Sequence, residues 1–157
     1  MYSRILVPID GSNPSVLALT EAIKLAKALH ACIRLMHVID SSPSSAVALE
    51  GWDFPAALES ARTAGQQLLT EAQARVSREG IEVDTALIEA VAETAGACII
   101  GKAREWHADL IICGTHGRRG LERLLMGSDS EYVLRHAPVP VLLIRAPQAS
   151  AHDQRAA

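Results

Sequence analysis

The sequence has few aromatic residues, since phenylalanine, tyrosine and tryptophan make up 3% of its 157 residues. Hydrophobic residues at 49% are numerous enough for a core, which must therefore be aliphatic. Positive charge is not in excess either, because the formal net charge is -3. Proteins that bind nucleic acid regardless of its sequence are usually basic, so we expect no nucleic-acid partner.

Long apolar runs and paired cysteines are also missing. No apolar run reaches the ~18 residues that a membrane span requires, and the first residues lead into a strand-like segment without a signal-peptide pattern. We therefore expect a cytoplasmic protein with no membrane partner. Cys32, Cys98 and Cys113 form no CxxC pair and stand beside apolar residues, which favours buried, reduced thiols over zinc ligands.

Short apolar runs alternate with stretches of helical periodicity along the chain. The predicted strands are residues 5–9, 32–38, 81–88, 110–113 and 139–144. The predicted helices are residues 14–30, 55–79, 93–107 and 129–135, with a loop at 40–53. We expect Asn13 to cap the first helix, Pro14 to be its first residue and Gly80 to end the second helix.

This alternation predicts an α/β fold, a Rossmann-like open parallel five-stranded sheet with helices on both faces. We expect a single domain over residues 1–146 and a flexible C-terminal tail over 147–157. Right-handed crossovers from a central first strand give the strand order 3-2-1-4-5. The first and fourth strands are then neighbours, and a ligand crevice is expected at their carboxyl ends, where Asp10 and Gly114 would meet.

A glycine-rich stretch, GTHGRRGLERLLMGSDS at residues 114–130, joins the fourth strand to the last helix. Glycines let a backbone approach a ligand closely, and a helix start attracts anions. Ser128 and Glu131 form a capping-box pattern, so we expect Ser128 to cap the helix. The stretch contains neither GxxxxGK[ST] nor GxGxxG. We predict that it holds nucleotide phosphates.

The remaining pattern, glycines at 114 and 117 followed after nine residues by Gly127-Ser128, resembles the nucleotide-binding signature of the universal stress protein family. The resemblance extends to VPIDGS at 7–12 and APVPVL at 137–142, and covers nearly the whole chain except 40–54 and the tail. It implies an adenine-nucleotide-binding fold, often dimeric, that retains ATP, with AMP or ADP as related ligands.

The resemblance also implies two groups of nucleotide contacts. The group at the carboxyl ends of the first two strands would contact the base and ribose: Pro8, Ile9, Asp10 and Val38. The group in the glycine-rich stretch would contact the ribose and phosphates: Gly114, His116, Gly117, Gly127, Ser128, Asp129 and Ser130.

Several of these residues also allow other interpretations. Asp10 could only cap the turn before the first helix. The glycines beside His116 place main chain rather than side chains at a ligand, which argues against a catalytic base there. Arg118, with Arg119 and Arg123 beyond it, could neutralise phosphates or form a solvated basic rim. Asp129 suits a helix start but repels phosphate unless Mg²⁺ joins the two; without a metal it would turn outward.

The last predicted strand, 139–144, is apolar on both sides and should form a sheet edge. The resemblance suggests that it pairs with its copy in a homodimer; the alternative is a strand covered only by its own helices.

We predict an ATP-binding stress or signalling protein with at most slow hydrolysis, because no positioned base or nucleophile is evident. The alternatives are a dimeric interaction module without nucleotide and an adenylating enzyme, for which little chain is left.

Overall fold

The computed structural model describes residues 1–42, 53–115 and 127–145. Its elements in chain order are β1 (Arg4–Pro8), α1 (Asn13–Leu29), β2 (Cys32–Asp40), α3 (Phe54–Ser77), β3 (Val83–Ala90), α4 (Ala95–Glu105), β4 (Leu110–Gly114), α5 (Ser128–His136) and β5 (Val141–Ile144). Each predicted strand and helix is therefore present, with bounds shifted by up to a few residues. The predicted tail at 147–157 lies outside the described residues.

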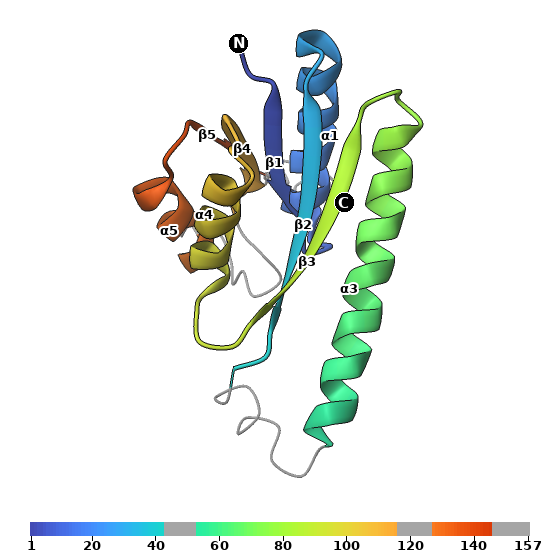
Figure 1. The fold of residues 1–157 in the computed structure, drawn as a ribbon, viewed down its shortest axis with the longest axis vertical. Helices are drawn as coiled ribbons and strands as arrows, with labels where there is room; N and C mark the ends of the chain where they lie inside the picture. Colours follow the sequence, from blue (N-terminus) through green and yellow to red (C-terminus); the bar gives the residue numbers. More distant parts are fainter. Residues whose placement is uncertain (43–52, 116–126, 146–157) are drawn as a thin grey trace, which may run out of the picture.

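The five strands form one parallel sheet in the order β3-β2-β1-β4-β5, which confirms the predicted fold class and strand order (Figure 1). Strand β1 is central and pairs with β2 from Arg4 to Pro8. Its register with β4 is much shorter, with Ile5 opposite Leu110 and Leu6 opposite Ile111. The two strands therefore end close together, and the segments that follow them leave from the same edge of the sheet.

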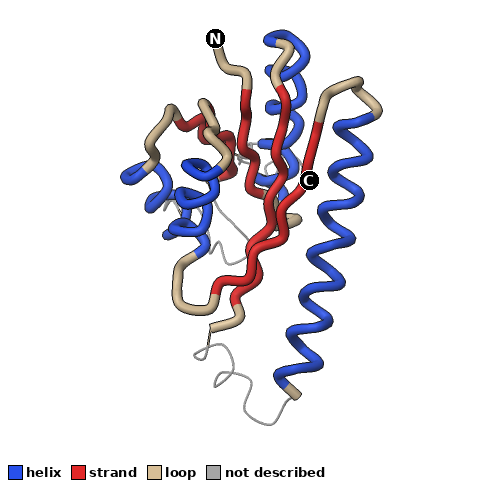
Figure 2. The backbone as a smooth tube through the Cα atoms, in the orientation of Figure 1, coloured by secondary structure: helices blue, strands red, loops and turns tan. Residues whose placement is uncertain are grey.

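Helices cover both faces of the sheet, with α1 and α3 on one face and α4 and α5 on the other (Figure 2). Because successive strand residues point to opposite faces, β1 places Ile5 and Val7 under α1 and α3, and Leu6 under α4 and α5. The largest fully buried side chains are aliphatic or methionine, as the low aromatic content predicts. Burying each of them stabilises the fold by roughly 1.5–3 kcal/mol.

The helix ends correct three sequence predictions. Ser12, not Asn13, caps α1, because its side-chain oxygen accepts the N–H of Ser15 at 3.4 Å while Asn13 is already helical. Helix α3 ends at Ser77, before Gly80, whose φ of +72° lies in the left-handed region. The last strand begins at Val141 rather than at residue 139; Pro140, which has no N–H to donate, precedes it.

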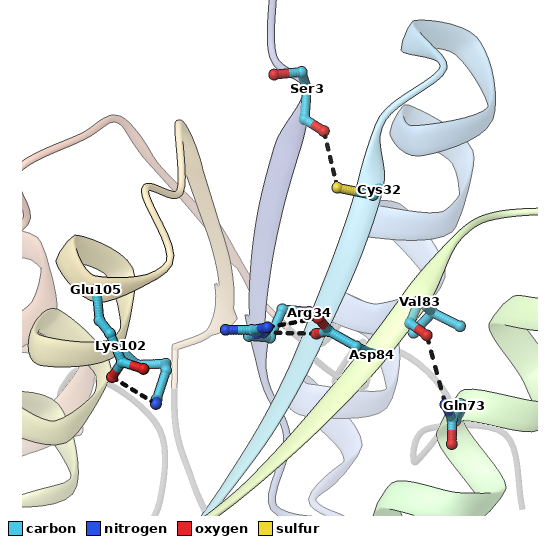
Figure 3. A network of polar contacts seen from close by, with 8 residues as sticks. All are labelled: Ser3, Cys32, Arg34, Gln73, Val83, Asp84, Lys102 and Glu105. Carbon is cyan, nitrogen blue, oxygen red and sulfur yellow. Dashed lines mark hydrogen bonds and ion pairs between the residues drawn. The ribbon is translucent and has the colours of Figure 1, made fainter.

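Polar groups near the amino ends of the strands hold neighbouring elements together (Figure 3). The guanidinium of Arg34 on β2 binds Asp84 on β3 through two hydrogen bonds of 2.6 Å, which raises the pKa of Arg34. Arg4 and Arg34 also flank the buried Trp106, each with its guanidinium carbon 4.8 Å from a ring centroid. These charges therefore serve the fold at the end of the sheet away from the predicted crevice.

No described helix combines the length and the apolar character that crossing a membrane requires.

Cys113, in the carboxyl half of β4, is buried, and burial raises the pKa of its thiol to about 12. Its reactivity therefore reports whether the core around β4 is folded. We expect an alkylating reagent at pH 8 to modify Cys113 in native protein far more slowly than the half-buried Cys32 and Cys98, with mass spectrometry locating the label. Unfolding in denaturant should remove the difference; equal rates in native protein would contradict the buried position.

The same shift makes stability depend on pH. The folded thiol ionises near 12 and the unfolded one near its ordinary value of 9.0, so folding favours the protonated form. This contribution is complete below about pH 9 and is lost as the pH rises toward 12. Unfolding at increasing pH should show this loss in the wild type and less of it in Cys113→Ala.

Candidate functional site

The two predicted halves of the site are neighbours because α1 lies directly against the end of β4. A Cβ added to Gly114 would lie 2.7 Å from the Cβ of Pro14 and 2.8 Å from its carbonyl carbon, closer than real side chains come. Only glycine allows this approach at position 114. The loop after β1 and the glycine-rich stretch after β4 therefore begin side by side, as the topology predicts.

The first half of the site is the turn between β1 and α1. One carboxylate oxygen of Asp10 accepts hydrogen bonds from the N–H of Ser12 at 2.9 Å and from its hydroxyl at 2.6 Å. The N–H of Asp10 lies 3.4 Å from the Ser15 hydroxyl oxygen. Asp10 thus shapes the turn, as the simpler interpretation of this residue expects. A carboxylate accepts several hydrogen bonds, so this role is compatible with a ligand contact.

The second half begins where β4 ends. The N–H of Gly127 donates to the carbonyl of Thr115 at 2.9 Å. The residues on either side of the segment 116–126 are therefore neighbours. The buried hydroxyl of Ser130 donates to the carbonyl of Gly114 at 2.9 Å. These two bonds fasten the first turn of α5 to the end of β4. The predicted contacts His116, Gly117 and Arg118 lie outside the described residues, as do Arg119 and Arg123.

The start of α5 differs from the capping-box prediction. Ser128 is the first helical residue, and Gly127 occupies the cap position with extended backbone. The cap prediction for Ser128 is therefore wrong, and no side-chain hydrogen bond caps the helix from position 127. The carbonyl of Gly127 accepts the N–H of Glu131 at 2.9 Å, which starts the helical ladder. A helix start without a side-chain cap presents N–H groups and the positive end of the dipole to an anion.

Asp129 points one carboxylate oxygen at the neighbouring helix. This oxygen accepts the N–H of Gly96 at 2.9 Å, in the first turn of α4. Gly96 is itself in close contact with α5, because an added Cβ would lie 2.9 Å from the Cβ of Tyr132. In the described part of the chain no three His, Cys, Asp or Glu residues gather as metal ligands. Magnesium binding at Asp129 stays a prediction.

The remaining contacts predicted from β1 and β2 lie beside these two halves. Pro8 is half-buried and Ile9 is buried, and the N–H of Ile9 donates to the carbonyl of Met36 on β2 at 2.8 Å. Val38 is half-buried and packs against the core beneath α4 and α5. The buried His37, not predicted as a site residue, lies next to Val38 and contacts Ile9; its only sequence signal is a polar residue inside an apolar strand.

Two open surface hollows of about 540 and 610 Å³ lie elsewhere on the described surface. One lies between α3 and β3, beside Arg62, Leu87 and Glu89. The other lies near the amino ends of the strands, beside Ser3 and Cys32. Both are lined by residues outside the β1 and β4 ends, so the candidate site rests on main-chain geometry rather than on cavity size.

The parallel 3-2-1-4-5 sheet, with its segments meeting at the carboxyl ends of β1 and β4, places the protein in the Rossmann-like α/β class. The sequence model of the universal stress protein family matches residues 1–145, and the chain belongs to this family.

Individual relatives agree with this assignment. A universal stress protein of Methanocaldococcus jannaschii is 34% identical over 149 residues, which cover 94% of this chain and 85% of the relative. A crystal structure of a family protein from Burkholderia pseudomallei is 35% identical, with a TM-score of 0.72 and coverage of 92% and 97% of the two chains. A structure of the family protein from Archaeoglobus fulgidus in complex with dAMP shares the fold at 20% identity, with a TM-score of 0.65 and coverage of 91% and 98%.

Replacing Asp129 tests the contact between α4 and α5. We expect Asp129→Ala to lower the free energy of unfolding by roughly 1 kcal/mol, because the N–H of Gly96 loses its acceptor. Asp129→Asn keeps an oxygen acceptor and should cost less. Urea unfolding measures both values, and an Ala variant as stable as the wild type would show that the contact contributes nothing.

Proposed function

We propose that the protein binds an adenine nucleotide, ATP first and ADP or AMP at the same place, and acts in stress response or signalling. The observation that carries this proposal is the start of α5, which has no side-chain cap and is held at the end of β4, against which the first turn of α1 lies. The dAMP complex of the Archaeoglobus fulgidus relative supports the ligand class.

The proposed site divides the nucleotide between its two halves. Base and ribose lie against Pro8, Ile9 and Val38, with a carboxylate oxygen of Asp10 accepting from a ribose hydroxyl. The phosphates lie beside Gly127 at the N–H groups of Ser128 and Asp129, because the N–H of Gly127 itself donates to Thr115. Ser130 contributes its main-chain N–H, because its hydroxyl hydrogen is donated to Gly114. Gly114, His116, Gly117 and Arg118 complete the set, the last three from outside the described residues.

We propose that the protein holds and reports nucleotide, with at most slow hydrolysis. The described part of the site offers main-chain amides. Amides that bind the substrate and the transition state equally well do not lower the activation barrier of hydrolysis. A turnover near the ~10 per second of ordinary enzymes would contradict this assignment.

We also propose a homodimer through β5, an edge strand of the sheet. The carbonyls of Pro140 and Ile144 accept the N–H groups of Ile111 on β4 and of Thr115 directly after it. The alternate residues Val141 and Leu143 therefore direct their main-chain groups away from β4. An apolar edge with outward hydrogen-bonding groups is a template for pairing with a second copy. If the protein dimerises without binding nucleotide, it is an interaction module instead.

Gly127→Val tests the phosphate half. The backbone at Gly127 has φ -62° and ψ 148°, which any residue adopts, so we expect the variant to fold. Its side chain should screen the amides of α5 and weaken ATP binding by about tenfold or more in calorimetry. Gly101→Val, at an exposed position of α4 with open space around it, is the matched control.

The outcomes are distinct. Unchanged affinity in Gly127→Val would mean that the phosphates bind elsewhere. If the wild type shows no heat with ATP and Mg²⁺, and denatured protein releases no nucleotide on anion exchange, the chain is an interaction module. Weaker binding by Asp129→Asn only in the presence of Mg²⁺ would assign the metal to Asp129.

Val141→Pro tests the dimer. The substitution removes an N–H that points away from β4 and leaves the pairing with β4 in place, since proline is tolerated at the start of an edge strand. We expect light scattering after size exclusion to show a dimer for the wild type and for Val141→Ala, which keeps the N–H, and a shift toward monomer for Val141→Pro. A monomeric wild type at micromolar concentration would contradict the proposal.

A further inference from the structure

His37 is a buried polar residue beside the proposed site that the nucleotide contacts do not use. It lies on β2, is 7% exposed, and its Nδ1 is 2.7 Å from the carbonyl oxygen of Ile9. A carbonyl oxygen only accepts, so Nδ1 carries the hydrogen and donates it. The bond joins residues 28 apart in sequence. It lies directly after the last paired residues of β1 and β2, which are Pro8 and Met36.

The bond acts where β1 turns into the site. The N–H of Ile9 donates to Met36 on β2, and its carbonyl accepts from His37 one residue further along the same strand. Both polar groups of the Ile9 main chain are thus held by β2. The next residue is Asp10, whose carboxylate organises the turn and the cap of α1. The side chain of His37 therefore holds the carbonyl of the residue directly before this turn.

The imidazole ring is itself held by α3. A Cβ added to Gly65 would lie 2.7 Å from Cδ2 of His37 and 2.9 Å from a methyl group of Leu87. The leucine methyl could move aside, but the ring is fixed at its other edge by the bond to Ile9. Glycine at position 65 thus lets the backbone of α3 close over the ring. The contact continues from α3 through His37 and Ile9 to Asp10.

We propose that His37 is a positioning residue for the nucleotide site, and that Gly65 keeps its ring in place. The proposal rests on the proposed function for its effect on ATP, and on the two bonds that hold Ile9 for its effect on the turn. His37 touches no nucleotide; it holds Ile9 so that Asp10 faces the ribose. A histidine that only fills the core would give packing without this effect.

The test compares His37→Leu with His37→Asn. The two side chains have the same branched shape, but only asparagine has an N–H donor near the position of Nδ1. Amide hydrogen exchange at residues 10–12 of the apo protein reports the turn, and calorimetry reports ATP affinity. We expect His37→Leu to raise exchange at 10–12 and to weaken ATP binding roughly tenfold, and His37→Asn to restore most of both.

Gly65→Ala provides a second route to the same change without altering His37. Its Cβ should displace the ring, so exchange at 10–12 should rise and ATP affinity should fall, as in His37→Leu. Gly101→Ala adds the same methyl group to a helix at a position with open space, and should leave both measurements unchanged.

Two results would overturn the proposal. One is normal exchange at 10–12 in a folded His37→Leu or Gly65→Ala variant; the other is an asparagine variant as impaired as the leucine variant, which would reduce His37 to packing. Failure of the wild type to bind ATP would reject the proposed function alone, because exchange at the turn is measured without nucleotide.

Discussion

The contact between Gly114 and Pro14 is the constraint on which the site depends. The first turn of α1 can lie against the end of β4 only where residue 114 has no side chain, since a Cβ would come within 2.7 Å of Pro14. Because β1 and β4 share a register of only two residue pairs, the sheet alone aligns these ends over a short distance. The helix contact and the bond from Ser130 to Gly114 extend this alignment to the loops.

The two ends of the sheet use their polar groups differently. At the amino ends, charged side chains pair with one another or stack on Trp106, and these contacts join neighbouring elements. At the carboxyl ends, Asp10 and Ser130 tie turns and helix starts to the sheet. At this end the first turn of α5 has no side-chain cap, so its main-chain N–H groups are not used by one.

The sequence predicts the strands and their order well, because buried parallel strands are short apolar runs and crossover handedness limits their arrangement. For the same reason it predicts that the chain after β1 and the end of β4 are neighbours, which the contact of Gly114 with Pro14 bears out. The helix caps are less predictable: Ser12 precedes the favourable pair Asn13-Pro14, and at α5 the capping-box pattern begins one residue inside the helix. Contacts such as that of Asp129 with Gly96 have no local signal, because the partner lies 33 residues away and depends on how two helices pack.

The most direct test of the central claim is a nuclear magnetic resonance titration of the isotope-labelled protein with ATP. If one nucleotide bridges both halves of the site, the amide signals of residues 10–12 and 127–130 should shift together along a single saturating curve. The amides at the amino ends of the strands, including Arg34 and Asp84, should stay in place. Saturating shifts confined to one half, or to the amino ends, would contradict the account.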